Sequence, residues 1–165
     1  MDISFSPEYP IEFGSVLEVL RDGREEILRD WLQRVRGNRA VQAGEALSDP
    51  VLLDHVPQLF DAMLAHLEMN RSREEAEQFA TVHGFTRRIT GYDVVETLVE
   101  LLMFRRAIWA HLSATGAGAE GACAAMERLD GLVDRAVVAS VRAYLDPTAR
   151  LLERRPLSAS PEPTA

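Results

Sequence analysis

The chain has 165 residues, of which 47% are hydrophobic and 27% charged, so it can bury the core of one globular domain. Its net charge of −8 argues against nucleic-acid binding, which needs clustered positive charge. The single cysteine, Cys123, excludes an internal disulfide, and no apolar run reaches the roughly 20 residues that cross a bilayer. With no secretory signal pattern at the N-terminus, these features favour a cytoplasmic protein.

The first part of the chain predicts a lead-in followed by a helix. Residues 1–14 contain Pro7 and Pro10 with scattered aromatic side chains, and we expect them to be extended. Apolar residues at helical spacing then predict a helix over residues 15–35. Gly23 weakens the middle of this helix and marks either a bend or the boundary between two helices.

Two further helices are predicted before the most apolar part of the chain. Residues 48–68 begin with a strong helix start, because Pro50 fits the first turn and the preceding Ser or Asp caps it. Pro57 lies inside this segment and should kink the helix or separate its first turn. Residues 72–90 begin with the spacing of a capping box, which Glu75 completes.

The segment over residues 91–112 is apolar nearly all round in its middle, which is typical of a central, largely buried helix. Gly91 and Tyr92 form the joint before this helix, and Asp93 with Glu96 has the spacing of a capping box. Helical spacing predicts one broad apolar face that leaves Met103 and Phe104 outside it. The residues of this face are Val94, Val95, Leu98, Leu101, Leu102, Ile108, Trp109 and Leu112.

The last long helix is predicted over residues 122–144, after a loop of small residues. On this helix Ala136, Ala139 and Ala143 are small enough for a second helix to approach closely. We expect them to form the seam of a homodimer, because the central helix has more apolar surface than one bundle can easily cover. The alternative is that they complete the core of a single chain.

The whole pattern predicts an all-α domain. No strand pattern is visible, and the run of helices predicts an antiparallel bundle of about five main helices over residues 15–146. Residues 147–165 are rich in Pro and Ser, which predicts a disordered tail.

Charged side chains within the apolar central helix need partners, because an unpaired buried charge costs several kcal/mol. Glu100 and Arg105 are such residues, and His83 and Arg87 stand one turn apart on the preceding helix. We expect all four to form one semi-buried ionic network in which Arg105 pairs with Glu100. His83 would let this network respond to pH between about 5 and 8. The alternative is a fixed network that locks two helices together.

Catalytic and metal-binding patterns are missing from the sequence. His55 and His66 lie eleven residues apart on one predicted helix, about 16 Å along its axis, which is too far for one metal ion. No HExxH, GxSxG, GxxxxGK[ST] or GxGxxG pattern occurs, so we expect neither an enzyme nor a dedicated metal site. For His83 two interpretations remain: a packing histidine bonded to a carboxylate, or a ligand of haem or of a small molecule.

The order HGFTRRITGYDVVETLVELLMFRR over residues 83–106 resembles the N-terminal domain of the RsbR/RsbRD family of stress-response regulators. Similar domains also stand in front of bacterial sensor histidine kinases. The family pattern is a His, an Arg one turn later, a Gly before an aromatic residue, and a helix with Glu-x-x-x-apolar-Arg. It matches His83, Arg87, Gly91, Tyr92, Glu100, Phe104 and Arg105.

The resemblance implies a non-enzymatic signalling domain that dimerises and takes part in two-component or stress-response pathways. No STAS or kinase domain is visible, so we expect a stand-alone sensor or regulatory module that passes its signal to another chain. The implied partners are a histidine kinase, a STAS protein or an anti-sigma factor, and no cofactor is expected. The alternative is a globin-like sensor that binds haem or another small ligand through His83.

Overall fold

A computed structural model describes residues 11–69, 74–115 and 119–146. Every regular element in these ranges is helical, which confirms the all-α prediction for the part of the chain described. The expected tail over residues 147–165 lies outside these ranges. The elements are α1 (Ile11–Asp22), α2 (Arg24–Arg36), the 3-10 turn η1 (Ala43–Ala46), α3 (Asp49–Leu53), α4 (Val56–Met69), α5 (Glu74–Ile89), α6 (Val94–Thr115) and α7 (Ala119–Leu145).

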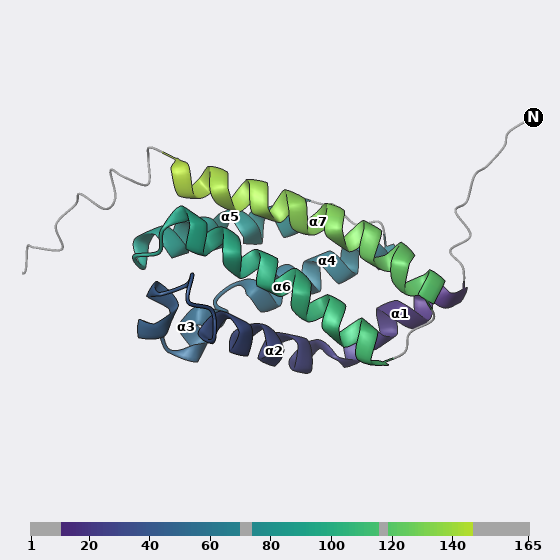
Figure 1. Cartoon of the computed structure of the whole chain (residues 1–165). Coiled ribbons are helices and arrows are strands. Elements are labelled where there is room, and N and C mark those ends of the chain that lie inside the picture. Colours follow the sequence, from purple (N-terminus) through teal and green to yellow (C-terminus); the bar gives the residue numbers. More distant parts are fainter. Residues whose placement is uncertain (1–10, 70–73, 116–118, 147–165) are drawn as a thin grey trace, which may run out of the picture.

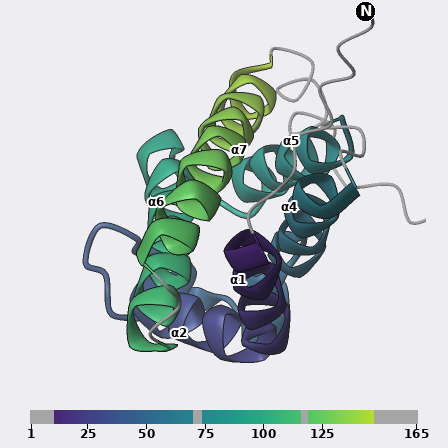
Figure 2. The same ribbon diagram turned by 90° about the vertical axis from the view of Figure 1, so that its right-hand side faces the viewer.

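The helices pack in two layers. α6 and α7 run antiparallel in front, and α1, α4 and α5 lie behind them (Figure 1). The view along the bundle shows α2 closing the lower edge, where it packs against α6 (Figure 2). The contact between α5 and α7 is the most extensive one in the fold. α5 meets α6 in the interior through its side chains, where Arg87 of α5 contacts Glu100 of α6.

Several predicted boundaries are confirmed and others are wrong. Gly23 separates α1 from α2, and a Cβ atom there would lie 2.0 Å from Nε2 of His111. The break before α4 leaves Pro57 in its first turn, as the predicted separation requires. However, α1 already begins at Ile11, so the expected lead-in over residues 1–14 is wrong for its last four residues, and residues 1–10 lie outside the described ranges. Similarly, α7 begins at Ala119, earlier than predicted.

The buried face of α6 differs from the predicted face. Met103 and Phe104 are buried, and the Phe104 ring meets the ring of Phe60 edge-on with 5.3 Å between centroids. Val95 and Trp109 lie on the outside, with 56% and 39% of their surface exposed. An apolar helix offers several equivalent faces, and its main partners α1, α2 and α7 decide which one turns inward.

The approach of α5 to α7 places Gly84 directly against the backbone of Ser140. A Cβ atom on Gly84 would lie 2.0 Å from the Ser140 carbonyl oxygen, so no larger residue fits at this crossing. Ala136 is buried in the core of the single chain, while Ala139 and Ala143 are half-buried. For Ala136 the predicted dimer seam is therefore wrong, because the small side chains of α7 accommodate helices of their own chain.

Candidate functional site: a buried ionic cluster

Glu100 lies at the centre of a charged cluster in the interior of the domain. Its side chain has no exposed surface, and its Oε2 accepts a 2.6 Å hydrogen bond from Nε of Arg87. The backbone carbonyl of Glu100 accepts a 3.0 Å hydrogen bond from Nε1 of Trp31, which fixes α2 against the same turn of α6. Glu100 therefore connects α2, α5 and α6.

Two side chains from α5 determine the charge state of Glu100. Burial raises the pKa of this carboxyl, but the close contact with His83 and the ion pair with Arg87 outweigh burial and leave the pKa below its usual value. His83 is fully buried with Nε2 3.3 Å from Oε2 of Glu100. Neither ring nitrogen of His83 has an aligned hydrogen-bond partner among the described residues. Glu100 is thus held as a carboxylate in the core.

Arg87 extends the cluster to the end of α3. It is fully buried, and it donates hydrogen bonds to the carbonyl oxygens of Leu52 and, at 3.4 Å, Val51. These carbonyls belong to the last turn of α3, where the helix has no internal donors for them. One guanidinium therefore neutralises Glu100 and also completes the hydrogen bonding of a five-residue helix.

Asp54 follows α3 in a backbone conformation that L-residues rarely adopt, with φ 41° and ψ −116°. Its carboxylate is 14% exposed and lies 2.5 Å from Nδ1 of His55 and 3.9 Å from Nη1 of Arg87. Such strain costs on the order of 1–3 kcal/mol and persists only where surrounding contacts enforce it. No local sequence pattern marks a strained residue, so Asp54 is not recognisable from the sequence alone.

Tyr92 covers the other side of Arg87. The Arg87 guanidinium carbon lies 5.0 Å from the centroid of the Tyr92 ring. Burial and the neighbouring Glu100 carboxylate raise the pKa of the Tyr92 hydroxyl. Gly91 has φ +90°, and the amides of Gly91 and Tyr92 donate to the carbonyls of Arg88 and Arg87, which is a Schellman cap. We call His83, Arg87, Glu100, Tyr92 and Asp54 the buried cluster.

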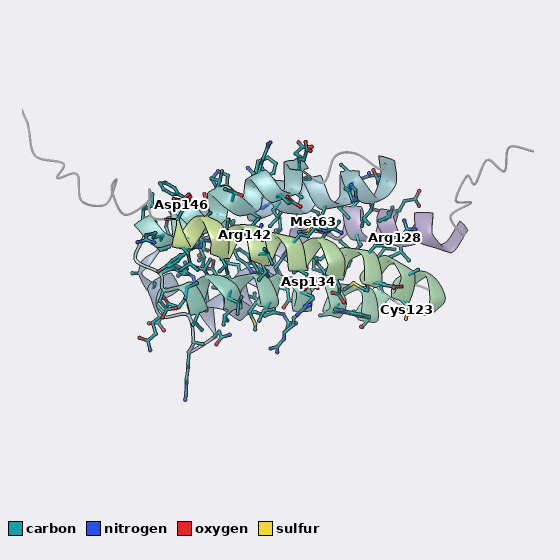
Figure 3. The ribbon with its side chains drawn as sticks, turned by 90° about the horizontal axis from the view of Figure 1, so that it is seen from above. Met63, Cys123, Arg128, Asp134, Arg142 and Asp146 are labelled. Carbon is teal, nitrogen blue, oxygen red and sulfur yellow. The ribbon has the colours of Figure 1, made fainter. Side chains whose placement is uncertain are left out.

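The predicted pairing of Arg105 with Glu100 is wrong. Nη1 of Arg105 lies 3.5 Å from Oδ1 of Asp134 on the surface of α7, where Figure 3 labels Asp134. An α-helix turns about 100° per residue, so two side chains five positions apart point about 140° away from each other. The structure therefore brings His83, Arg87 and Glu100 together and leaves Arg105 outside the buried cluster.

The predicted capping box at the start of α6 is confirmed and adds a further link. Glu96 accepts from the backbone amide of Asp93 at 2.9 Å, and Asp93 accepts from the amide of Glu96 at 2.8 Å. The second carboxylate oxygen of Glu96 accepts from the amide of Ala43 at 2.8 Å. This contact holds the segment around η1 against the first turn of α6.

The geometry gives no support to haem ligation by His83. The ring has no exposed surface, Nε2 faces Glu100, and the adjacent Gly84 packs directly on the backbone of α7. A haem iron would have to separate α5 from α7 or displace Glu100. Within the described ranges, no group of three His, Cys, Asp or Glu side chains could hold a metal ion.

A shallow cavity of about 380 Å³ lies between α2 and α6, away from the buried cluster. Its α2 side carries Arg29, Asp30 and Arg34, and Asp30 is already paired with Arg34 at 2.7 Å. Ala107 and Ala110 form the opposite wall. The mixture of paired charges and small apolar side chains does not select a ligand class.

Among the described helices, none has the length and apolar content needed to span a membrane.

The family of this chain follows from comparison with known proteins. No curated protein and no solved structure matches the chain. Residues 25–156, which include every member of the buried cluster, match the family described as the RsbT co-antagonist protein rsbRD N-terminal domain. This match covers most of the 165 residues. The chain therefore belongs to the rsbRD N-terminal domain family, whose members are regulatory domains of the stressosome type.

Proposed function

We propose that this chain is a non-enzymatic bacterial sensor or regulatory module that acts by protein–protein interaction with a kinase, a STAS protein or another stress-response partner. Membership of a regulatory domain family supports this proposal. The observation that carries it is the buried cluster, in which Glu100 and Arg87 are both fully buried and connect α2, α3, α5 and α6.

The energetics of the buried cluster favour a regulatory role. A buried ion pair contributes little net stability, because desolvation of the two charges offsets their attraction. The cluster contains two carboxylates, Glu100 and Asp54, but Arg87 is the only arginine that contacts them in the described ranges. Nε2 of His83 lies 3.3 Å from the same carboxylate oxygen of Glu100 that Arg87 contacts. A change in this balance would alter the contacts of α3, α5 and α6 together.

The proposal is tested by reconstituting regulation. The purified chain is added to phosphorylation assays with the kinase and STAS protein of its own organism, and the rate is compared with that for Glu100→Gln. We expect the wild-type chain to change the rate at least several-fold, and Glu100→Gln to lose most of this effect. Arg105→Gln, which alters an exposed ion pair on α6, is the matched control and should behave as wild type. If the wild-type chain neither binds these proteins nor alters phosphorylation, the proposal fails.

We also propose that the module is a homodimer, paired through the outer face of α6 rather than through the alanines of α7. Val95 and Trp109 are exposed on this face, and Leu98 and Leu102 between them are half-buried. They recur at intervals of three, four and seven residues and so form one apolar stripe, about 21 Å long at 1.5 Å per residue. Two-fold pairing is the commonest way to cover such a stripe.

Light scattering tests the dimer. The wild type should have twice the mass of one chain at micromolar concentration, and Leu102→Arg should be monomeric with an unchanged helical spectrum. Val138→Arg is the control, because Val138 is 48% exposed on α7, away from the stripe. A monomeric wild type would exclude the dimer, and dissociation by Val138→Arg alone would move the interface to α7.

A further inference from the structure

The last turn of α7 is fastened to the joint between α5 and α6. The Tyr144 hydroxyl donates a 2.7 Å hydrogen bond to the backbone carbonyl of Tyr92. Arg88 donates to the carbonyl of Tyr144, and its guanidinium carbon lies 5.4 Å from the centre of the Tyr144 ring. The end of α7 and the start of α6 lie at the same end of the bundle (Figure 1). In Figure 3, Arg142 and Asp146 mark this end of α7.

Tyr92 belongs both to this attachment and to the buried cluster. Its ring lies against the Arg87 guanidinium, while its carbonyl receives the Tyr144 hydroxyl. Its amide donates to the carbonyl of Arg87 at 3.0 Å. Gly91 precedes it with φ +90°, a conformation that glycine adopts without strain. Only 3% of the surface of Tyr92 is exposed, so the ring cannot shift independently of its neighbours.

We propose that Tyr92 couples the buried cluster to the attachment of the C-terminal turn of α7. When the pair between Arg87 and Glu100 is intact, the guanidinium holds the Tyr92 ring and so positions its carbonyl for Tyr144. When Glu100 loses its charge, the hydrogen bond from Nε of Arg87 to Glu100 no longer fixes the guanidinium. The Tyr92 ring then loses its support, and the joint at Gly91 rotates. The hydrogen bond from Tyr144 then breaks, and the last turn of α7 opens.

This inference rests on the proposed function only in treating the buried cluster as the place where a signal enters. The coupling is a property of the purified chain and needs no partner. The coupling must also act in the opposite direction, from Tyr144 to the buried cluster, because the coupling free energy between two sites is reciprocal. Releasing Tyr144 must therefore loosen the buried cluster, including the end of α3 that Arg87 holds.

Hydrogen–deuterium exchange with mass spectrometry on the full chain tests the coupling in both directions. Glu100→Gln keeps the shape of the side chain and removes its charge, and Tyr144→Phe removes one hydroxyl on a half-buried residue. We expect each variant to speed amide exchange about fivefold, the factor for one net hydrogen bond, both in residues 142–146 and in residues 51–54. The double variant should exchange no faster at either place than the faster single variant.

Arg105→Gln is the control, since it removes an ion pair between α6 and α7 that does not involve Tyr92. It should leave exchange at both places within twofold of wild type. The coupling is refuted if Tyr144→Phe speeds exchange at the end of α7 but leaves residues 51–54 unchanged, or if the two effects multiply in the double variant. If Glu100→Gln does not fold, Tyr144→Phe alone decides. A negative phosphorylation assay would refute the proposed function without affecting this result.

Discussion

The pair between Glu100 and Arg87 gives the sharpest test of the buried cluster, through the substitutions Glu100→Leu and Arg87→Met. Both side chains have no exposed surface, and Oε2 and Nε lie 2.6 Å apart. Glu100→Leu leaves the Arg87 guanidinium buried without its carboxylate, which costs about 3–5 kcal/mol. The total free energy of unfolding of a domain of this size is about 5–15 kcal/mol, so this one substitution removes a large part of its stability.

The double variant should lose much less unfolding free energy than the two single variants lose in sum. It replaces a buried ion pair with two apolar side chains of similar volume, which is often neutral or stabilising. The carbonyls of Leu52 and Val51 still lose their donor, and we expect this to leave a net cost of about 1–2 kcal/mol. The coupling energy between the two substitutions should therefore reach about 3 kcal/mol or more.

Urea unfolding followed by circular dichroism measures all four free energies of the cycle. The matched control is Arg105→Met with Asp134→Leu, a pair with 32% and 71% of its side-chain surface exposed. That cycle should give a coupling below about 1 kcal/mol, because water screens exposed charges. Additivity of the Glu100 and Arg87 substitutions within about 0.5 kcal/mol would refute the buried pair.

Four further predictions concern the charge of Glu100 and three glycines. The pKa of Glu100 lies below its ordinary 4.5, so its ionisation stabilises the fold fully above that pH and the contribution is lost as pH falls through the lowered pKa. In urea titrations the stability difference between wild type and Glu100→Gln should shrink in acid, and a pH-independent difference would contradict this assignment. Gly84→Ala should destabilise by about 2 kcal/mol or more, because its Cβ would lie 2.0 Å from the Ser140 carbonyl oxygen. Gly131→Ala on α7, where a Cβ atom would meet nothing within 4 Å, should stabilise by about 0.5–1 kcal/mol, and thermal melts measure both glycine variants. Gly91→Ala should lower stability by about 1–2 kcal/mol through its φ of +90° alone, and an unchanged melting temperature would show that the joint adapts.

Local physics explains what the sequence by itself determined. Helix starts and interruptions depend on neighbouring residues, so the box between Asp93 and Glu96 and the breaks at Gly23 and before Pro57 were predictable. The proximity of His83, Arg87 and Glu100 was predictable for a related reason. A carboxylate inside an apolar helix needs a cation, and two basic side chains one turn apart on the preceding helix can supply it.

The tertiary structure decided what depends on contacts between distant parts of the chain. Arg87 rather than Arg105 pairs with Glu100, because α5 crosses the inner face of α6 while Arg105 points toward α7. Similarly, the strain at Asp54 exists because Arg87 and the surrounding helices hold the end of α3. The orientation of α6 and the burial of Ala136 were also beyond the sequence. Each face of an apolar helix can be buried at similar cost, so only the packing of its neighbours selects one.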